Sequence, residues 1–213
     1  MTILVFVAHP DDEIIGAGAT IAKYTQKGKE VISIIFSYGE GSDPLMKPSL
    51  LTSSRIAESK RAGRILGCTN IVFLGLSDLK FIEGLGKPFV GTKVKHLLEE
   101  YNPEIIFTHC PDDPHPHHRA VANFVKEIVD TLHIKTKIYT FTISSPIRIL
   151  HRGRAKLYID VSSSFDLKKK AIKTFKSQWR SWLAWYYYPL AIIKARIAGL
   201  KAGCRYAEVF YKW

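Results

Sequence analysis

Four short apolar runs, each followed by a polar loop and then by a helical pattern, constrain the fold of this chain more than any other feature. The runs LVFVA, VISIIF, IVFL and EIIF are continuously apolar and do not alternate with polar residues. Strands that are buried on both faces of a parallel sheet have this pattern, because helices cover both faces. The sequence therefore predicts an α/β fold built on a mostly parallel sheet.

The expected elements alternate along most of the chain. We expect strands at Ile3–Ala8, Val31–Ser37, Ile71–Leu74, Ile105–His109 and Ile138–Ile143, and helices near Ile14–Gln26, Leu51–Leu66, Thr92–Tyr101 and Arg119–Leu132. This order predicts a Rossmann-like sheet with helices on both faces. A C-terminal elaboration should add a strand at Leu157–Val161, a helix from Phe165 to about Phe175, and a last strand at Tyr206–Tyr211. A length of 213 residues suits one domain over residues 1–213.

The net positive charge of the chain comes entirely from its last third. Residues 1–147 carry 16 Lys and Arg against 16 Asp and Glu, whereas residues 148–213 carry 15 against 3. The net charge of +12 therefore comes from the C-terminal portion alone. Because no nucleic-acid recognition motif accompanies this charge, we expect no nucleic-acid partner.

The C-terminal basic portion also contains an aromatic segment, Trp179–Gly203, with three Trp and three Tyr. One interpretation is a packed helix pair with solvated lysines. The other is a surface for anionic membrane lipid or for an acidic partner, because aromatic and cationic side chains together are typical of interfacial segments. Both interpretations stay open, and the second makes peripheral contact with an anionic membrane a candidate interaction of this protein.

Two polar clusters follow two of the expected strands. His9, Asp11 and Asp12 come directly after the first strand, and the fourth strand leads into a second cluster that contains His109, Asp112, Asp113, His115, His117 and His118. In an open parallel sheet, ligands bind beyond the carboxyl ends of the strands. The first and fourth strands are commonly neighbours in such a sheet, so we expect the two clusters to meet.

Two imidazoles and a carboxylate suit a catalytic Zn²⁺ whose fourth position is open to water, and the same ligands would admit Fe²⁺ or another divalent ion. The alternative is purely structural: a turn with an N-capping acid after the first strand, and a proline-containing loop before a helix. Two such clusters, both at strand ends, favour the metal.

These residues carry a resemblance to a known family. Ala8-His9-Pro10-Asp11-Asp12-Glu13 matches the (A/P)HPDDE motif, and residues 115–119, HPHHR, match the second motif, HPDHR, of the LmbE-like, zinc-dependent de-N-acetylases related to N-acetylglucosaminyl-phosphatidylinositol de-N-acetylase. Further similar segments are Arg55-x-x-Glu58 in the second helix, Ser177-Gln178, and Ala207-Glu208-Val209-Phe210 in the last strand. The resemblance covers most of the chain.

The resemblance implies specific roles for five residues. It implies that His9, Asp12 and His118 bind zinc, that Asp11 is the general base, and that His115 stabilises or protonates the tetrahedral intermediate. Amide hydrolysis needs an activated water, a polarised carbonyl and a proton for the departing amine, so these roles are chemically consistent.

Three further residues are assigned less directly. Arg55 corresponds to the substrate-binding arginine of the family; the alternative is a helix-face salt bridge with Glu58. Asp78 in GLSDL is similar to a family aspartate that binds substrate, although Leu79 replaces the usual Gly. His117 stands where the family commonly has Asp, and it could be a bystander, a partner of a ligand, or a competing ligand.

The sequence and the resemblance together predict a metal-dependent hydrolase that removes the N-acetyl group from a substrate containing N-acetylglucosamine, either a small molecule or a lipid-linked amino sugar. Two alternatives are a zinc amidohydrolase for a non-sugar N-acyl metabolite, and a metal-binding or nucleic-acid-binding module without catalysis. Three cysteines without a CxxC pair, and a first strand without signal-peptide features, indicate a reducing compartment. We therefore expect a cytoplasmic protein, peripheral to a membrane if it binds one, and we list a homo-oligomer among its candidate assemblies.

Overall fold

The computed structural model describes residues 1–143, 155–180 and 182–213. The strands are β1 (Thr2–Val7), β2 (Glu30–Ser37), β3 (Asn70–Leu76), β4 (Ile105–His109), β5 (Lys137–Phe141), β6 (Lys156–Asp160) and β7 (Ala207–Lys212). The helices are α1 (Asp12–Gln26), α2 (Pro48–Leu66), α3 (Phe81–Leu85), α4 (Pro88–Tyr101), α5 (Pro116–Thr131), α6 (Phe165–Ile172) and α7 (Trp182–Ala202), with a short 3₁₀ turn at Gln178–Arg180.

The described strands form one sheet in the order β3-β2-β1-β4-β5-β7-β6. Strands β1 to β5 pair in parallel, whereas β7 runs antiparallel to both β5 and β6. In the centre, Val5 of β1 lies between Ser33 of β2 and Phe107 of β4. The expected mostly parallel α/β sheet is confirmed, and β1 and β4 are neighbours.

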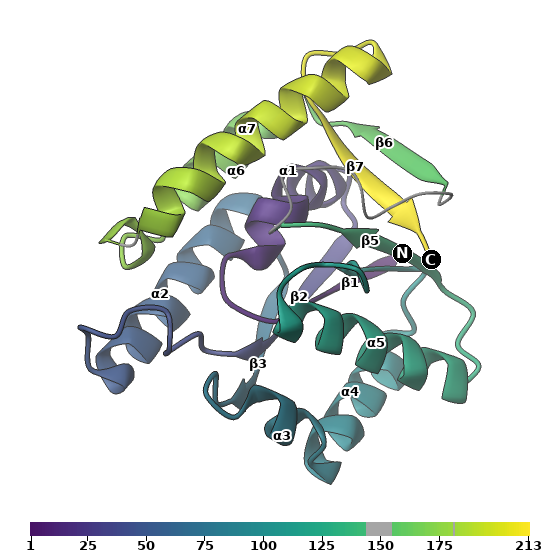
Figure 1. The fold of residues 1–213 in the computed structure, drawn as a ribbon. Helices are drawn as coiled ribbons and strands as arrows, with labels where there is room; N and C mark the ends of the chain where they lie inside the picture. Colours follow the sequence, from purple (N-terminus) through teal and green to yellow (C-terminus); the bar gives the residue numbers. More distant parts are fainter. Residues whose placement is uncertain (144–154, 181) are drawn as a thin grey trace.

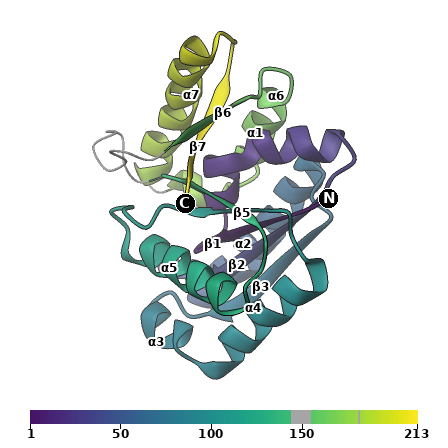
Figure 2. The same ribbon diagram turned by 90° about the vertical axis from the view of Figure 1, so that its right-hand side faces the viewer.

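Helices cover both faces of the sheet (Figures 1 and 2). On one face, α3, α4 and α5 pack on a core that includes Leu4, Phe36 and Ile106. On the other face, α1, α2 and α6 pack on a core that includes Val5 and Phe107. Alternate residues of the central strands point to opposite faces, so a continuously apolar strand supplies both cores at once.

Two expectations about the elements need correction. The run IVFL was expected to be buried on both faces, but β3 is an edge strand, and Ile71, Val72 and Phe73 are only half-buried. The aromatic segment was interpreted in one alternative as a helix pair, but the structure has a single long helix there, α7. The short helix α3 was not expected, because five residues are too few to show a helical period.

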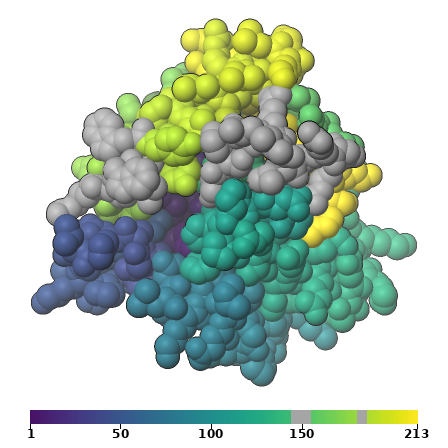
Figure 3. Space-filling view, in the orientation of Figure 1, coloured from purple at the N-terminus to yellow at the C-terminus, as the bar shows by residue number. Residues whose placement is uncertain are grey.

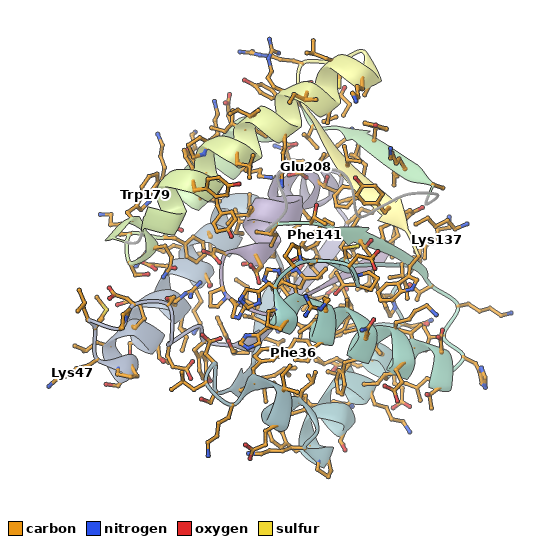
Figure 4. The ribbon with its side chains drawn as sticks, viewed as in Figure 1. Phe36, Lys47, Lys137, Phe141, Trp179 and Glu208 are labelled. Atoms are coloured by element: carbon orange, nitrogen blue, oxygen red, sulfur yellow. The ribbon has the colours of Figure 1, made fainter. Side chains whose placement is uncertain are left out.

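A buried ion pair fastens the C-terminal elaboration to the first helix. The Lys168 ammonium of α6 donates to the Glu208 carboxylate of β7, and both side chains are almost fully buried. The same carboxylate accepts hydrogen bonds from the backbone N–H groups of Ala19 and Thr20 in α1. Lys168 also donates to the carbonyl of Ile15. This network gives Glu208, which lies beneath α7 in Figure 4, a structural role.

No helix among the described residues combines the length and the hydropathy needed to cross a bilayer.

Candidate functional site

The site is built from two loops that leave neighbouring parallel strands at the same edge of the sheet. After β1 the chain passes through His9 and Pro10 to Asp11, which has a φ of 92° and stands as the N-cap of α1. After β4 it passes through a loop to His115, the N-cap of α5. Because β1 and β4 pair, the two loops lie side by side, and nitrogen-bearing side chains gather between Phe141 and Phe36 (Figure 4).

Three of the predicted metal ligands converge on one point. The Asp12 Oδ2 atom lies 3.3 Å from His9 Nδ1 and 3.4 Å from His118 Nε2. Ligand atoms around a tetrahedral zinc ion are spaced by about this distance, since zinc–nitrogen and zinc–oxygen bonds are about 2.0–2.2 Å long. The group His9, Asp12 and His118 could therefore hold a metal ion.

Carboxylates on the far side of both imidazoles support the fit of a cation. His118 Nδ1 lies 3.0 Å from Asp113 Oδ1, and His9 Nε2 lies 3.1 Å from Asp78 Oδ1. A metal-binding histidine usually donates its other N–H to a carboxylate, which directs the remaining nitrogen lone pair to the metal. Both candidate ligand histidines, His9 and His118, have this arrangement, so the donor set fits a divalent cation.

The charges around the metal group shift its pKa values strongly. Burial alone would lower the pKa of His118, but Asp12 and Asp113 raise it to about 9. The pKa of Asp12 is held well below its usual range, because His118 and His109 outweigh the effect of burial. A cluster that holds an ionised carboxylate among imidazoles attracts a cation when the imidazoles are unprotonated.

His109 lies beneath the metal group and is fully buried. Its ring stacks on that of His118 with a centroid separation of 3.9 Å and an interplanar angle of 3°. Its Nε2 atom accepts a hydrogen bond from the backbone N–H of Ala8 and lies 3.3 Å from Asp12 Oδ2. Burial, together with the charge of His118, lowers the pKa of His109 to about 4. His109 thus supports the ligand ring of His118 from below.

Asp11 and Arg55 form an ion pair at the entrance to the metal group. The Arg55 Nη2 atom lies 3.1 Å from Asp11 Oδ1 and also donates to the carbonyl of Pro10, while Nη1 donates to the carbonyl of Gly39. Burial raises the pKa of Asp11 to about 7, against the lowering effect of Arg55. The alternative that pairs Arg55 with Glu58 is wrong.

The Glu58 carboxylate is occupied elsewhere. It accepts hydrogen bonds from the Ser177 backbone N–H at 2.9 Å and from the Ser177 hydroxyl at 2.6 Å. This contact anchors the segment after α6 to α2.

His115 and His117 both lie beside His9, with ring centroids 5.1 Å and 5.2 Å from its own. The Nδ1 atom of His115 accepts a hydrogen bond from the His117 backbone N–H at 3.2 Å. The His117 ring stacks on Phe81 at 4.2 Å, and its Nδ1 atom lies 3.0 Å from His9 Nε2. His9, His115 and His117 form a second group whose nitrogen atoms could meet a metal ion. His117 thus contacts the candidate ligand His9 and is itself placed to be a competing ligand.

A cavity of about 300 Å³ opens over the metal group. Figure 3 shows the N-terminal segment in a hollow between α2, α5 and the C-terminal portion of the chain. One wall is polar and contains Asp11, Arg55, Asp78 and His115. The other wall comes from the C-terminal portion and is mostly aromatic: Phe175, Trp179, Tyr187 and Tyr188.

All of the predicted site residues border this cavity: His9, Asp11, Asp12, Arg55, Asp78, His115 and His118. The sequence also offers Asp112 or Asp113 as the carboxylate that orients a ligand imidazole, and the structure has Asp113 in contact with His118. Sequence analysis missed the aromatic wall and the support from His109. The aromatic composition of residues 179–203 was the available signal, but nothing in the sequence places that segment against the metal group.

Comparison with known proteins agrees with the geometry. The pattern of the family described as "GlcNAc-PI de-N-acetylase" matches residues 4–129, more than half of the chain. The chain belongs to this family. It is 26% identical over 223 residues to diacetylchitobiose deacetylase of Thermococcus kodakarensis, an alignment that covers 97% of this chain and 80% of the relative. It is 28% identical over 184 residues to a Bacillus cereus protein named "Probable N-acetyl-alpha-D-glucosaminyl L-malate deacetylase 2", with 83% of each chain covered.

Two solved structures have the same fold as this chain. The N,N'-diacetylchitobiose deacetylase from Pyrococcus horikoshii superposes with a TM-score of 0.81 and 25% identity, covering 100% of this chain and 83% of that one. The conserved protein TT1542 from Thermus thermophilus superposes with a TM-score of 0.81 at 22% identity, covering 98% and 92%.

Proposed function

We propose that this protein is a metal-dependent hydrolase that removes the N-acetyl group from a substrate containing N-acetylglucosamine, releasing acetate and a free amino sugar. The observation that carries the proposal is the group His9, Asp12 and His118 beside the half-buried Asp11, all of which line one cavity. Relatives named as deacetylases of diacetylchitobiose and of a GlcNAc-malate support the same chemistry.

The proposed cofactor is Zn²⁺, held by His9, Asp12 and His118; Fe²⁺ would suit the same donors. A divalent cation there would polarise the acetamide carbonyl and lower the pKa of water. Asp78 and Asp113 hold the two imidazoles in the tautomers that leave a nitrogen free for the ion.

Asp11 is the proposed general base. It takes a proton from the water that attacks the acetamide carbon, and the proton then passes to the nitrogen as the carbon–nitrogen bond breaks. Arg55 orients its carboxylate at 3.1 Å. The second proton of the water passes from the new carboxylic acid to the released amine, so the products are acetate and an ammonium group, and atoms and charge balance.

His115 is the proposed stabiliser of the developing oxyanion. Its Nδ1 atom accepts the His117 backbone N–H, so a neutral ring carries its proton on Nε2. Burial and the charge of His118 lower the pKa of His115 to about 4, which favours that neutral form. A neutral imidazole that donates a hydrogen bond stabilises an oxyanion without first losing a proton.

The substrate is proposed to be an amino sugar, free or lipid-linked. The aromatic wall offers flat apolar faces to a sugar ring, and Arg55 and Asp78, which also line the cavity, are the proposed partners of its hydroxyl groups. Asp78 would combine this contact with its hold on His9. A non-sugar N-acyl substrate and a module without catalysis are the alternative functions.

The remaining parts of the proposal concern context. We place the protein in the cytoplasm, acting as one domain over residues 1–213, with a homo-oligomer and peripheral membrane contact as further candidates and with no nucleic-acid partner. The three cysteines form no disulfide in the structure.

The test is acetate release from a panel of GlcNAc derivatives: the free sugar, chitobiose, an aryl glycoside and a lipid-linked form. Protein with a measured zinc content is compared with protein treated with chelator, and with chelated protein to which zinc has been returned. We expect metal-dependent release from at least one acceptor. Metal-loaded protein that releases acetate from none of them would favour a non-sugar amide.

A further inference from the structure

Helix α7 has an unusual distribution of apolar side chains, and it lies at the outer edge of the molecule in both ribbon views (Figures 1 and 2). Three small residues, Ala191, Ala195 and Ala198, pack inward and are at most 6% exposed. Tyr187, Tyr188 and Ile192 are half-buried against the core, but four other large apolar side chains of α7 are exposed. A helix on the surface of a soluble domain normally has the reverse arrangement, with its polar face outside.

The outward side chains form a continuous stripe, which we call the α7 stripe. Tyr186, Ile193, Ile197 and Leu200 are 43%, 53%, 44% and 75% exposed. Their spacings of seven, four and three residues place them on one face of an α-helix. Single exposed apolar residues are ordinary, but an aligned row of four is a candidate contact surface.

Cations border the α7 stripe on both sides. At 100° per residue, Arg196 lies about 60° to one side of Ile193 and Lys201 about 80° to the other. Both cations are exposed. Residues 167–207 contain ten Lys and Arg and no Asp or Glu, so no acidic side chain of this segment offsets them. An apolar face between cationic edges, with an aromatic end, matches the chemistry of an anionic lipid surface.

We propose that the α7 stripe docks onto an anionic phospholipid bilayer. The apolar side chains enter the boundary between headgroups and acyl chains, and Arg196 and Lys201 lie at the level of the lipid phosphates. The charge argues against a second copy of this chain as the occupant, because pairing two α7 stripes would bring like charges together.

Docking would also bring the active site to the membrane. Tyr187 and Tyr188, on the same helix, line the cavity over the metal group. If the proposed function is correct, a lipid-linked amino sugar would reach this cavity directly from the bilayer. The docking itself does not depend on the reaction, so it is tested by binding alone.

The experiment is sedimentation of the full chain with vesicles. One set contains 30% phosphatidylglycerol in phosphatidylcholine, the other phosphatidylcholine alone, and both are measured at about 0.1 M and 0.5 M salt. The stripe variant is Ile193→Gln with Leu200→Gln. The control variant, Leu50→Gln with Phe89→Gln, removes two comparably exposed apolar residues from α2 and α4. Circular dichroism establishes that each variant is folded.

We expect wild type and control to bind the anionic vesicles, with salt weakening the binding, and the stripe variant to bind at least tenfold more weakly. Acetate release from a soluble substrate should be the same in all three proteins, which separates docking from the reaction. Three results would overturn the proposal: no binding by wild type, equal binding to both vesicle types, or equal binding by the stripe variant. Light scattering without vesicles provides a further test. A dimer in wild type that is absent in the stripe variant would show that the α7 stripe binds a second copy of the chain, and would contradict the proposal.

Discussion

The hold of Asp113 on His118 gives the most specific prediction about the metal group. Asp113 Oδ1 accepts from His118 Nδ1 at 3.0 Å and from the His115 backbone N–H at 3.0 Å, and Oδ2 accepts from the Ile143 backbone N–H. Asp113→Asn keeps the shape but removes the charge that orients the imidazole. Loss of such a partner typically weakens metal binding 10–100-fold, or about 1.4–2.7 kcal/mol.

The assay is competition for zinc with a chromophoric chelator at pH 7.5. The matched control is Asp112→Asn, which removes the same charge from the neighbouring residue. The Asp112 carboxylate lies 3.9 Å from the Cys110 thiol. We expect the zinc affinity of the control to stay within about threefold of wild type. Equal affinities for Asp113→Asn and wild type, or equal losses in both variants, would refute the reasoning that a specific carboxylate contact orients His118.

Three other predictions concern stability and positioning. Lys168→Met should lower the free energy of unfolding in urea by about 3–5 kcal/mol, because it leaves the Glu208 carboxylate buried without its cation; a loss below about 1 kcal/mol would contradict the buried ion pair. Gly39→Ala should lower kcat/KM by about 10–100-fold, since its Cβ would lie 2.1 Å from Arg55 Nη1, whereas Gly28→Ala, with a similar φ but open space, should leave it unchanged. Zinc at about 100 times its Kd should stabilise the metal-free protein by about 2.7 kcal/mol in thermal unfolding, and no stabilisation would argue against a folded metal site.

The central fold was predictable from local patterns. Continuous apolar runs mark buried parallel strands, and the pairing of β1 with β4 follows from the handedness of strand–helix–strand units. The edge position of β3 was not predictable from its run, because exposure on one side depends on whether another strand pairs with it. The five residues of α3 were too few for a periodic signal.

The candidate site was predictable where its residues are close in sequence. His9 and Asp12 lie three residues apart at the junction of β1 and α1, and the step to His118 needed only the neighbouring positions of two strands. The partner of Arg55 was harder to predict, because Asp11 and Glu58 both offer a carboxylate. Ser177 binds Glu58 in the folded chain, and Arg55 pairs with Asp11.

The aromatic wall shows the limit of the sequence most clearly. Trp179, Tyr187 and Tyr188 are about 60 residues or more from His118 along the chain, and only the path of α6 and α7 brings them to the cavity. Composition marked the segment as unusual, but the tertiary contacts decided its place beside the metal group.

The most direct test of metal-assisted deacetylation with Asp11 as base compares wild type and Asp11→Asn, each with its zinc content measured, for acetate release from the best GlcNAc acceptor. We expect one zinc per chain in both proteins and a kcat lowered by about 10²–10⁴-fold in the variant. A variant that keeps its zinc and releases acetate within tenfold of the wild-type rate would contradict the role of Asp11.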